Sequence, residues 1–184
     1  MSPFLLRRAV RVLRGGGIVA YPTEGVYGLG CDPLDGVAVG RLLALKGRSR
    51  RKGLIMIAER FERLRPLVGA LDPDLEAAAR ADWPGPVTWV LPAAPATPSW
   101  LTGGRPTLAV RVTAHPLAAA LCRAFGRPLV STSANRSGAR PARSPLAVRR
   151  QLGDAVDLIL HGALGGLRGP TPIRDGASGR LLRR

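Results

Sequence analysis

A chain of 184 residues, 46% of them apolar, is long enough to form one domain with a buried core. Its formal net charge of +16, from 28 Lys and Arg against 12 Asp and Glu, favours a partner that carries phosphate groups. There is no apolar run of membrane-helix length and no secretory start, and the two cysteines suit neither a disulfide framework nor a zinc site, so we expect a cytoplasmic protein with free thiols at Cys31 and Cys122 and no membrane association.

Short apolar runs alternate with amphipathic stretches along the whole chain. Ser2-Pro3 is a typical N-cap and first helical position, and Ser144-Pro145 repeats this helix start. In chain order the patterns predict a helix from residue 3 to the glycines at 15–17, a strand at 18–20, a helix at 35–47, a strand at 54–58, helices at 59–68 and 72–81, strands at 87–91 and 108–112, a helix at 115–125, a strand at 128–132, a helix from 144, a strand at 158–160, and a terminal hairpin turned at Asp175-Gly176.

This alternation, without repeats or a low-complexity linker, predicts the α/β class. We expect a single domain over residues 1–184, built on a twisted mixed sheet, with parallel and antiparallel strands, flanked by helices. The Pro-, Thr- and Gly-rich segment 92–106 is predicted to be a mobile loop that covers a substrate.

The charge is unevenly distributed. Between Trp83 and Gly153 there is no Asp or Glu, whereas nine arginines lie there. Biased codon usage would explain arginine in place of lysine, but it would not explain the missing acids. The distribution therefore favours a nucleotide or nucleic-acid partner.

The first candidate site is the glycine-rich segment at residues 21–33, YPTEGVYGLGCDP, directly after an apolar strand. Its spacing matches neither the dinucleotide fingerprint nor the P-loop. Backbone amides freed by glycine can hold anionic groups, and Thr23 could bond a polar ligand. The alternative is an ordinary tight turn in which Glu24 pairs with an arginine.

The second candidate is the basic loop that begins at Lys46-Gly47-Arg48 and continues to Lys52. Guanidinium groups pair with phosphate in a bidentate manner and lysine adds a point charge, so the loop can clamp a triphosphate. The alternative is that Lys46 interacts with the helix dipole at a C-terminus and the following residues form a solvated basic loop.

Two strands carry the remaining candidates. The hydroxyls and amide of Ser131-Thr132-Ser133-Ala134-Asn135 follow a predicted strand and can form a polar pocket wall, or simply a turn or helix cap. Arg111 interrupts an apolar strand and, if buried, needs either a ligand carboxylate or an internal salt bridge.

Other chemistries find little support. His115 and His161 are far apart and belong to no metal-binding motif, no carboxylate cluster suggests a protein-built metal site, and no nucleophile elbow is present. Catalysis would therefore depend on positioning and electrostatics, as in nucleotidyl and phosphoryl transfer.

Taken together, these motifs resemble the YrdC family. The resemblance is carried by the PTE turn, K-x-R at Lys46 and Arg48, WPGP at 83–86, LAVRV at 108–112 and STSAN at 131–135, in the family's order. It extends from about residue 15 to the C-terminus, and the length is similar to that of the short bacterial, TsaC-type members. The family fold is a mixed sheet with a concave, positively charged face.

The resemblance implies a threonylcarbamoyl-AMP synthase reaction. L-threonine, bicarbonate or CO2, and ATP with its Mg²⁺ would give threonylcarbamoyl-AMP and pyrophosphate. The product would serve modification of the adenosine at tRNA position 37 in ANN-decoding tRNAs, through a TsaD, TsaB and TsaE-type transfer complex, and tRNA or other RNA would bind the basic face. The implied ATP residues are Lys46, Arg48, Lys52, Thr107, Ser133, Asn135 and Arg183, with Lys46 and Arg48 catalytic. The implied threonine residues are Thr23, Arg111 and Ser131.

The sequence departs from the family pattern in two places. Gly25 stands where many members have threonine, and Lys52 stands where an asparagine would contact the nucleotide. The glycine-rich segment would then be a backbone wall of the pocket.

The rival hypothesis is a basic RNA-binding module without catalysis, although three Phe and two Tyr offer few stacking platforms for single-stranded RNA.

Overall fold

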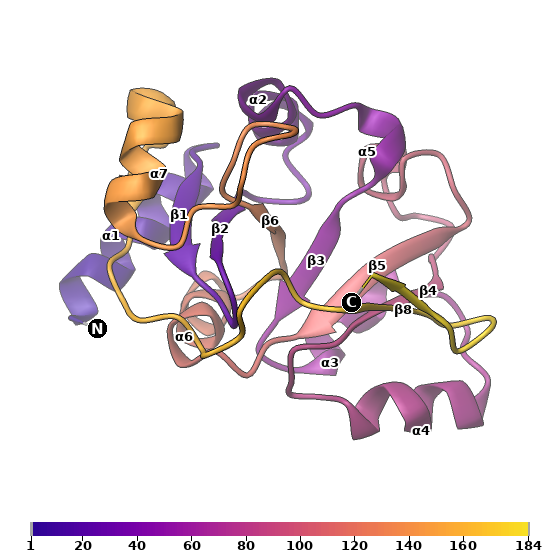
Figure 1. Ribbon diagram of the computed structural model, residues 1–184. Coiled ribbons are helices and arrows are strands. Elements are labelled where there is room, and N and C mark those ends of the chain that lie inside the picture. Colours follow the sequence, from indigo (N-terminus) through magenta and orange to yellow (C-terminus); the bar gives the residue numbers. More distant parts are fainter. Residues whose placement is uncertain (1, 184) are drawn as a thin grey trace.

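The computed structural model describes residues 2–183, which form one mixed sheet with helices around it (Figure 1). The strands are β1 (Val19–Pro22), β2 (Tyr27–Gly30), β3 (Ile55–Ala58), β4 (Thr88–Pro92), β5 (Thr107–Val112), β6 (Leu129–Ser133), β7 (Leu158–Ile159), β8 (Ile173–Asp175) and β9 (Leu181–Arg183). The helices are α1 (Pro3–Arg14), α2 (Gly36–Lys46), α3 (Phe61–Leu64), α4 (Pro73–Ala81), α5 (Ser99–Thr102), α6 (Pro116–Phe125) and α7 (Pro145–Leu152), with 3-10 turns at Arg50–Lys52, Arg65–Leu67 and Gly153–Ala155.

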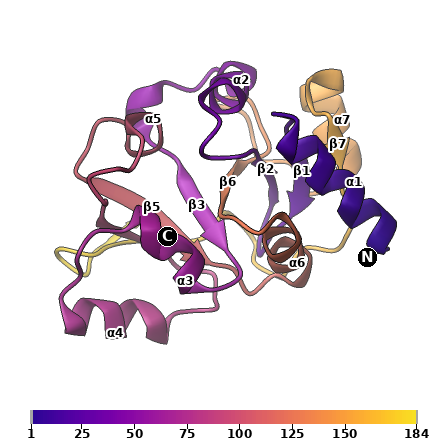
Figure 2. The ribbon, with the colours of Figure 1, turned by 180° about the vertical axis from the view of Figure 1, so that it is seen from behind.

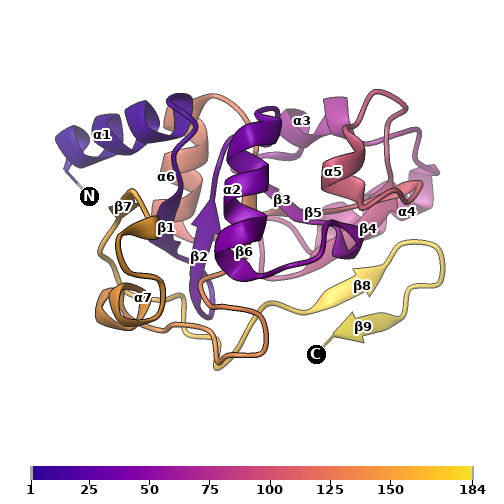
Figure 3. The same cartoon turned by 90° about the horizontal axis from the view of Figure 1, so that it is seen from above.

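Within residues 2–183 the sheet has nine strands in the order β7-β1-β2-β6-β3-β5-β4-β8-β9. The pairs β1/β7, β3/β5 and β4/β8 are parallel, and the other neighbours are antiparallel. Seen from above, β7 and α7 lie at one end of the sheet and the β8–β9 hairpin lies at the other (Figure 3). The predicted α/β class and mixed sheet are confirmed.

The helix starts follow from local capping chemistry. The side chain of Asp35 accepts hydrogen bonds from the Val37 and Ala38 amides at the start of α2, and Gly47 ends that helix with a φ of 58°. Ser144 accepts from the Ala147 amide at the start of α7. These boundaries agree with the sequence expectations because caps and terminal glycines act within a few residues.

The sheet is held between two apolar clusters. The smaller joins Ala9 and Leu13 of α1 to Leu121 and Phe125 of α6 and to strand residues such as Tyr21. Seen from behind, α1 and α6 lie side by side (Figure 2). The larger cluster takes alternate residues of the same strands, such as Ala20 and Met56, and includes buried side chains of α2, α3, α5 and α7.

Three sequence expectations were wrong in detail. The glycine-rich segment is largely a β1–β2 hairpin, because Gly28 and Gly30 sit in a strand. A Cβ at Gly30 would lie 2.8 Å from the ring of Tyr21, so glycine here permits close packing and does not mark a turn. The helix expected at 59–68 is only α3 followed by a 3-10 turn that contains Pro66. Segment 92–106 contains helix α5, with Leu101 buried.

None of the helices within residues 2–183 is both long and apolar enough to cross a membrane. Cys31 and Cys122 are buried free thiols, as predicted.

Candidate active site

A cavity of about 250 Å³ opens over the middle of the sheet. Register explains which side chains form its floor, because paired residues on adjacent strands point to the same face. Ile55 of β3 pairs with Ser131 of β6 on one side and with Ala109 of β5 on the other, and Ala109 pairs in turn with Val90 of β4. All four residues line the cavity.

Successive side chains of β5 point to opposite faces of the sheet, so alternate residues belong to the cavity and to the apolar core. Thr107, Ala109 and Arg111 face the cavity. The alternate residues Leu108 and Val110 are buried in the larger apolar cluster. An arginine can therefore interrupt an apolar strand without entering the core.

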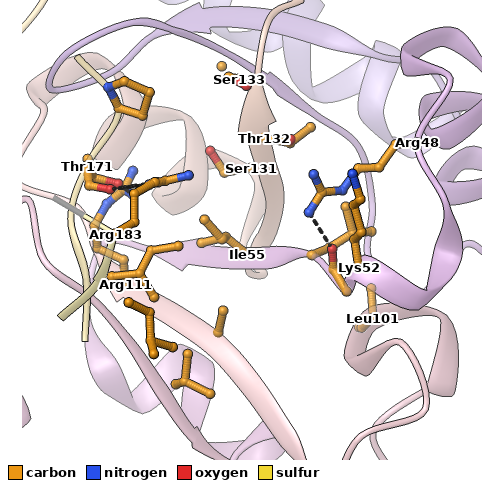
Figure 4. Close-up of a pocket in the computed structure, with 18 of the residues that line it drawn as sticks. Arg48, Lys52, Ile55, Leu101, Arg111, Ser131, Thr132, Ser133, Thr171 and Arg183 are labelled. Carbon is orange, nitrogen blue, oxygen red and sulfur yellow. Dashed lines mark hydrogen bonds between the residues drawn. The ribbon is translucent and has the colours of Figure 1, made fainter. Parts of the chain in front are cut away.

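The cationic side chains stand on two sides of this floor. Figure 4 shows Arg48 and Lys52 on one side, Arg111, Thr171 and Arg183 on the other, and Ile55 and Ser131 between them. Arg48 comes from the loop after α2 and donates to Gly53 O at 3.0 Å. Arg183 comes from β9 and donates to Thr171 O at 3.1 and 2.6 Å.

The electrostatics of the cavity favour an anion. Its cationic lining residues are Arg48, Lys52, Arg105, Arg111 and Arg183, and none of the lining residues within 2–183 is Asp or Glu. Desolvation lowers the pKa of Arg48, and repulsion from Arg105 adds to this shift. The pKa of Arg183 is lowered by desolvation and then by Arg111 and Arg48. The mutual repulsion of these cations would be relieved by a bound polyanion.

Arg111 is held by a buried polar network. Its guanidinium donates to Glu24 Oε2 at 3.1 Å and to the hydroxyls of Thr171 at 2.8 Å and Thr88 at 3.3 Å. Thr113 donates to the other Glu24 oxygen at 2.6 Å. The salt bridge named above as an alternative for both Glu24 and Arg111 is therefore present. Arg111 Nε is nevertheless a buried donor with no partner within residues 2–183, and so is Arg48 Nε.

Lys46 and Asn135 lie behind the cavity wall. The Lys46 ammonium donates to Ser133 O, to Asn135 O at 2.8 Å and to Asn135 Oδ1 at 3.5 Å. Asn135 in turn donates to Arg136 O and Ala139 O, each at 2.8 Å. An ammonium has three N–H donors, and these contacts tie Lys46 to the end of β6, the strand that presents Ser131 and Ser133 to the cavity.

Lys46 predicts a pH dependence of stability. Burial, with repulsion from Arg48, lowers its pKa from 10.5 to about 8. Between these two values the unfolded chain keeps a proton that the folded chain has lost, so the free energy of unfolding rises with pH. The slope is at most about 1.4 kcal/mol per pH unit.

Urea unfolding of the wild type and Lys46→Met from pH 7 to pH 10 measures this effect. The difference in unfolding free energy should shift in favour of the wild type above pH 8, since groups common to both proteins cancel. A difference that stays constant with pH would contradict the assignment.

Most of the residues proposed from the sequence meet at the cavity. Thr23, Arg48, Lys52, Thr107, Arg111, Ser131, Ser133 and Arg183 line it, whereas Lys46 and Asn135 do not. Sequence reasoning missed Arg105 and Thr171 as lining residues. Arg105 lies in the Pro-rich segment 92–106, which was expected to cover a substrate. Nothing in the local sequence around Thr171 indicated that it would reach Arg111.

No metal centre emerges from the described part of the chain, where no group of three or more His, Cys, Asp or Glu side chains could hold an ion.

Comparisons with known proteins point in one direction. The Sua5/YciO/YrdC family model, described as "Telomere recombination", matches residues 11–184. The threonylcarbamoyl-AMP synthase of Halorhodospira halophila is 59% identical over 182 residues, covering 99% of this chain and 95% of that protein. The protein of the same name from Methylococcus capsulatus is 56% identical over 183 residues, covering 100% of this chain and 98% of the relative.

Solved structures agree with the sequence comparisons. P. abyssi Sua5 complexed with L-threonine matches with a TM-score of 0.93 and 35% identity, over 100% of this chain and 54% of that one. This chain therefore spans about half the length of that Sua5. E. coli YciO matches with a TM-score of 0.88 and 28% identity, over 100% of this chain and 90% of that one.

Proposed function

Because the chain belongs to the Sua5/YciO/YrdC family, we propose that it is a threonylcarbamoyl-AMP synthase, which converts L-threonine, bicarbonate or CO2, and ATP to threonylcarbamoyl-AMP and pyrophosphate. The observation that carries the proposal is the cavity lined by five cationic side chains and, within residues 2–183, by no acidic one. A nucleotidyltransferase that joins anionic substrates needs such a field.

The chemistry explains why charge matters more than a nucleophile. The threonine nitrogen and CO2 form a carbamate, and a carbamate oxygen then displaces pyrophosphate from the α-phosphorus. Attacking group and electrophile are both anionic, so part of the barrier is their repulsion, which preorganised cations lower. The enzyme contributes positioning and electrostatic stabilisation, and none of its side chains needs to form a covalent intermediate.

The two sides of the cavity suit two anionic groups, the threonine carboxylate and the ATP phosphates. We assign the threonine carboxylate to Arg111, with Thr23 and Ser131 beside it. We assign the ATP phosphates to Arg48 and Lys52, and further nucleotide contacts to Thr107, Ser133 and Arg183, while Lys46 and Asn135 support the wall from behind. The cavity volume of about 250 Å³ lies below the roughly 300–1,000 Å³ of typical ligand pockets, so ATP would extend beyond it over exposed Arg105.

The remaining assignments follow from this activity. Mg²⁺ would arrive with ATP, and the product would be passed to a TsaD, TsaB and TsaE-type complex acting on tRNA position 37. Cytoplasmic localisation and direct contact of tRNA or another RNA with basic residues belong to the same proposal.

The test is pyrophosphate release by the purified protein with Mg²⁺, omitting threonine, bicarbonate or ATP in turn. We expect release only in the complete mixture, together with a threonine-containing adenylate by mass spectrometry. If a folded protein released none and bound RNA with a steep salt dependence, the RNA-binding module would be the better description.

A further inference from the structure

The segment between β7 and β8 crosses the loop that joins β1 to β2. We call residues 162–172 the strap; in Figure 1 it is the golden trace that passes in front of β2, β6 and β3 towards β8. The Gly165 amide donates to Thr23 O at 3.0 Å and the Leu167 amide donates to Glu24 O at 2.9 Å. At its start, the Gly162 amide and carbonyl bond the Tyr27 hydroxyl at 3.2 and 3.0 Å. The strap therefore covers the loop that carries Thr23 and Glu24.

The strap approaches so closely that position 25 has no room for a side chain. A Cβ on Gly25 would lie 1.8 Å from Gly169 O and 3.0 Å from the Leu167 side chain. The first of these distances is impossible without a backbone shift. Gly25 is the position where the sequence departs from the family pattern, and the position of the strap in this chain leaves room only for glycine there.

Arg143 joins the strap to the loop. Its Nη1 donates to Gly25 O at 2.6 Å, to Leu167 O at 3.1 Å and to Arg168 O at 2.9 Å. The backbone next to Arg143 is held by two hydrogen bonds. The Ala142 carbonyl accepts from the Tyr27 amide at 2.8 Å, and the Ala142 amide donates to Ala134 O at 3.0 Å. Arg143 does not line the cavity.

The strap ends on two groups of the active site. The Thr171 hydroxyl accepts from Arg111 Nη1 at 2.8 Å, and the Thr171 carbonyl accepts from Arg183 Nε at 3.1 Å and Nη2 at 2.6 Å. Two of the five cavity cations are therefore oriented by one strap residue. A displacement of the strap would release both guanidinium groups from their present directions.

We propose that Arg143 is a positioning residue: it fastens the strap to the β1–β2 loop and thereby sets, through Thr171, the orientation of Arg111 and Arg183. The proposal rests on the proposed function for its kinetic consequence. Its structural part, the fastening of the strap, does not depend on which reaction the cavity catalyses.

The kinetic test compares Arg143→Ala with Arg140→Ala, which removes the same charge from the same exposed loop. Within residues 2–183 the Arg140 side chain makes no hydrogen bond or ion pair and only its carbonyl accepts one, from Gln151 Nε2 at 3.1 Å, so it is a matched control. A hydrogen bond to a charged group is stronger than one between neutral groups, but solvent weakens an exposed one such as those of Arg143. We expect KM for threonine to rise roughly tenfold in Arg143→Ala, with kcat within about twofold, and neither to change in Arg140→Ala.

Two further variants separate positioning from a general structural role. Arg143→Lys keeps a donor at this place and should recover part of the loss. Arg143→Ala combined with Thr171→Val should be less than additive, because both remove the same orientation of Arg111. Gly25→Ala displaces the strap without changing charge and should raise KM for threonine as well, whereas Gly40→Ala, where a Cβ meets no atom within 4 Å, should not.

Hydrogen exchange provides a readout that needs no activity. Amides of residues 162–172 should exchange faster in Arg143→Ala than in the wild type or Arg140→Ala. If the wild type shows no threonine-dependent turnover, the proposed function fails and exchange alone decides the fastening. Unchanged exchange in the strap, equal kinetic effects of the two arginine variants, or full additivity with Thr171→Val would overturn the proposal.

Discussion

Replacing Arg48 by alanine should lower kcat/KM for ATP by about two to three orders of magnitude while changing the free energy of unfolding by less than about 1 kcal/mol. Arg48 lines the cavity, its Nε is a buried donor without a partner in residues 2–183, and desolvation lowers its pKa. A desolvated guanidinium with an unpaired donor is stabilised when a polyphosphate binds and accepts its hydrogen bonds. Within residues 2–183 its side chain makes one hydrogen bond, to Gly53 O, which is too weak a reason to hold the guanidinium there.

Arg51→Ala is the control for this prediction. Arg51 is exposed, lies three residues further along the same loop and does not line the cavity, so its removal subtracts the same charge from the same region. Pyrophosphate release at varied ATP concentration, with urea unfolding of each variant, measures both quantities. Similar losses in the two variants would mean that the loop acts through its total charge and that Arg48 has no particular contact with the phosphates.

The parts of the fold that could be read from the sequence are those set by local chemistry. Asp35 and Gly47 bound α2 as expected, because a cap bonds amides two or three residues away and a glycine adopts a positive φ without strain. Strand β2 could not be recognised in this way. Gly30 stands in it because the ring of Tyr21, on the neighbouring strand, occupies the space of a side chain, and that contact exists only in the folded sheet.

In the site, too, features set by the local sequence could be predicted and contacts between distant segments could not. Ser131, Ser133 and Arg111 were identifiable because they are polar residues on or at the end of apolar strands, and their common face follows from strand register. The contacts of Arg143 and Thr171 could not be foreseen, since they join segments more than a hundred and about sixty residues apart. Lys46 shows a third case: its pattern was recognised, but the contacts of its ammonium with Ser133 O and Asn135 O, almost ninety residues away in the sequence, could not be foreseen.

Arg111→Met should lower the free energy of unfolding by about 3–5 kcal/mol, because it leaves the Glu24 carboxylate buried without its cation. Glu24 is only 5% exposed and would keep Thr113 as its remaining side-chain donor. Activity should be lost in the same variant. Loss of both quantities alone does not distinguish a ligand-binding arginine from an internal salt bridge whose removal distorts the cavity.

The double variant Glu24→Gln/Arg111→Met separates these two roles. Replacing both charges by neutral groups of similar size should restore most of the stability, since breaking a buried pair costs far more than removing it. If Arg111 holds the threonine carboxylate, activity stays absent although the fold is recovered, because the neutral double variant offers no cation to the substrate. The double-mutant cycle compares the wild type, Glu24→Gln, Arg111→Met and the double variant. Urea unfolding and threonine-dependent pyrophosphate release are measured on all four proteins. Recovery of turnover together with stability would show that the pair is structural and that the carboxylate is bound by another cavity cation, such as Arg183 on the same side (Figure 4).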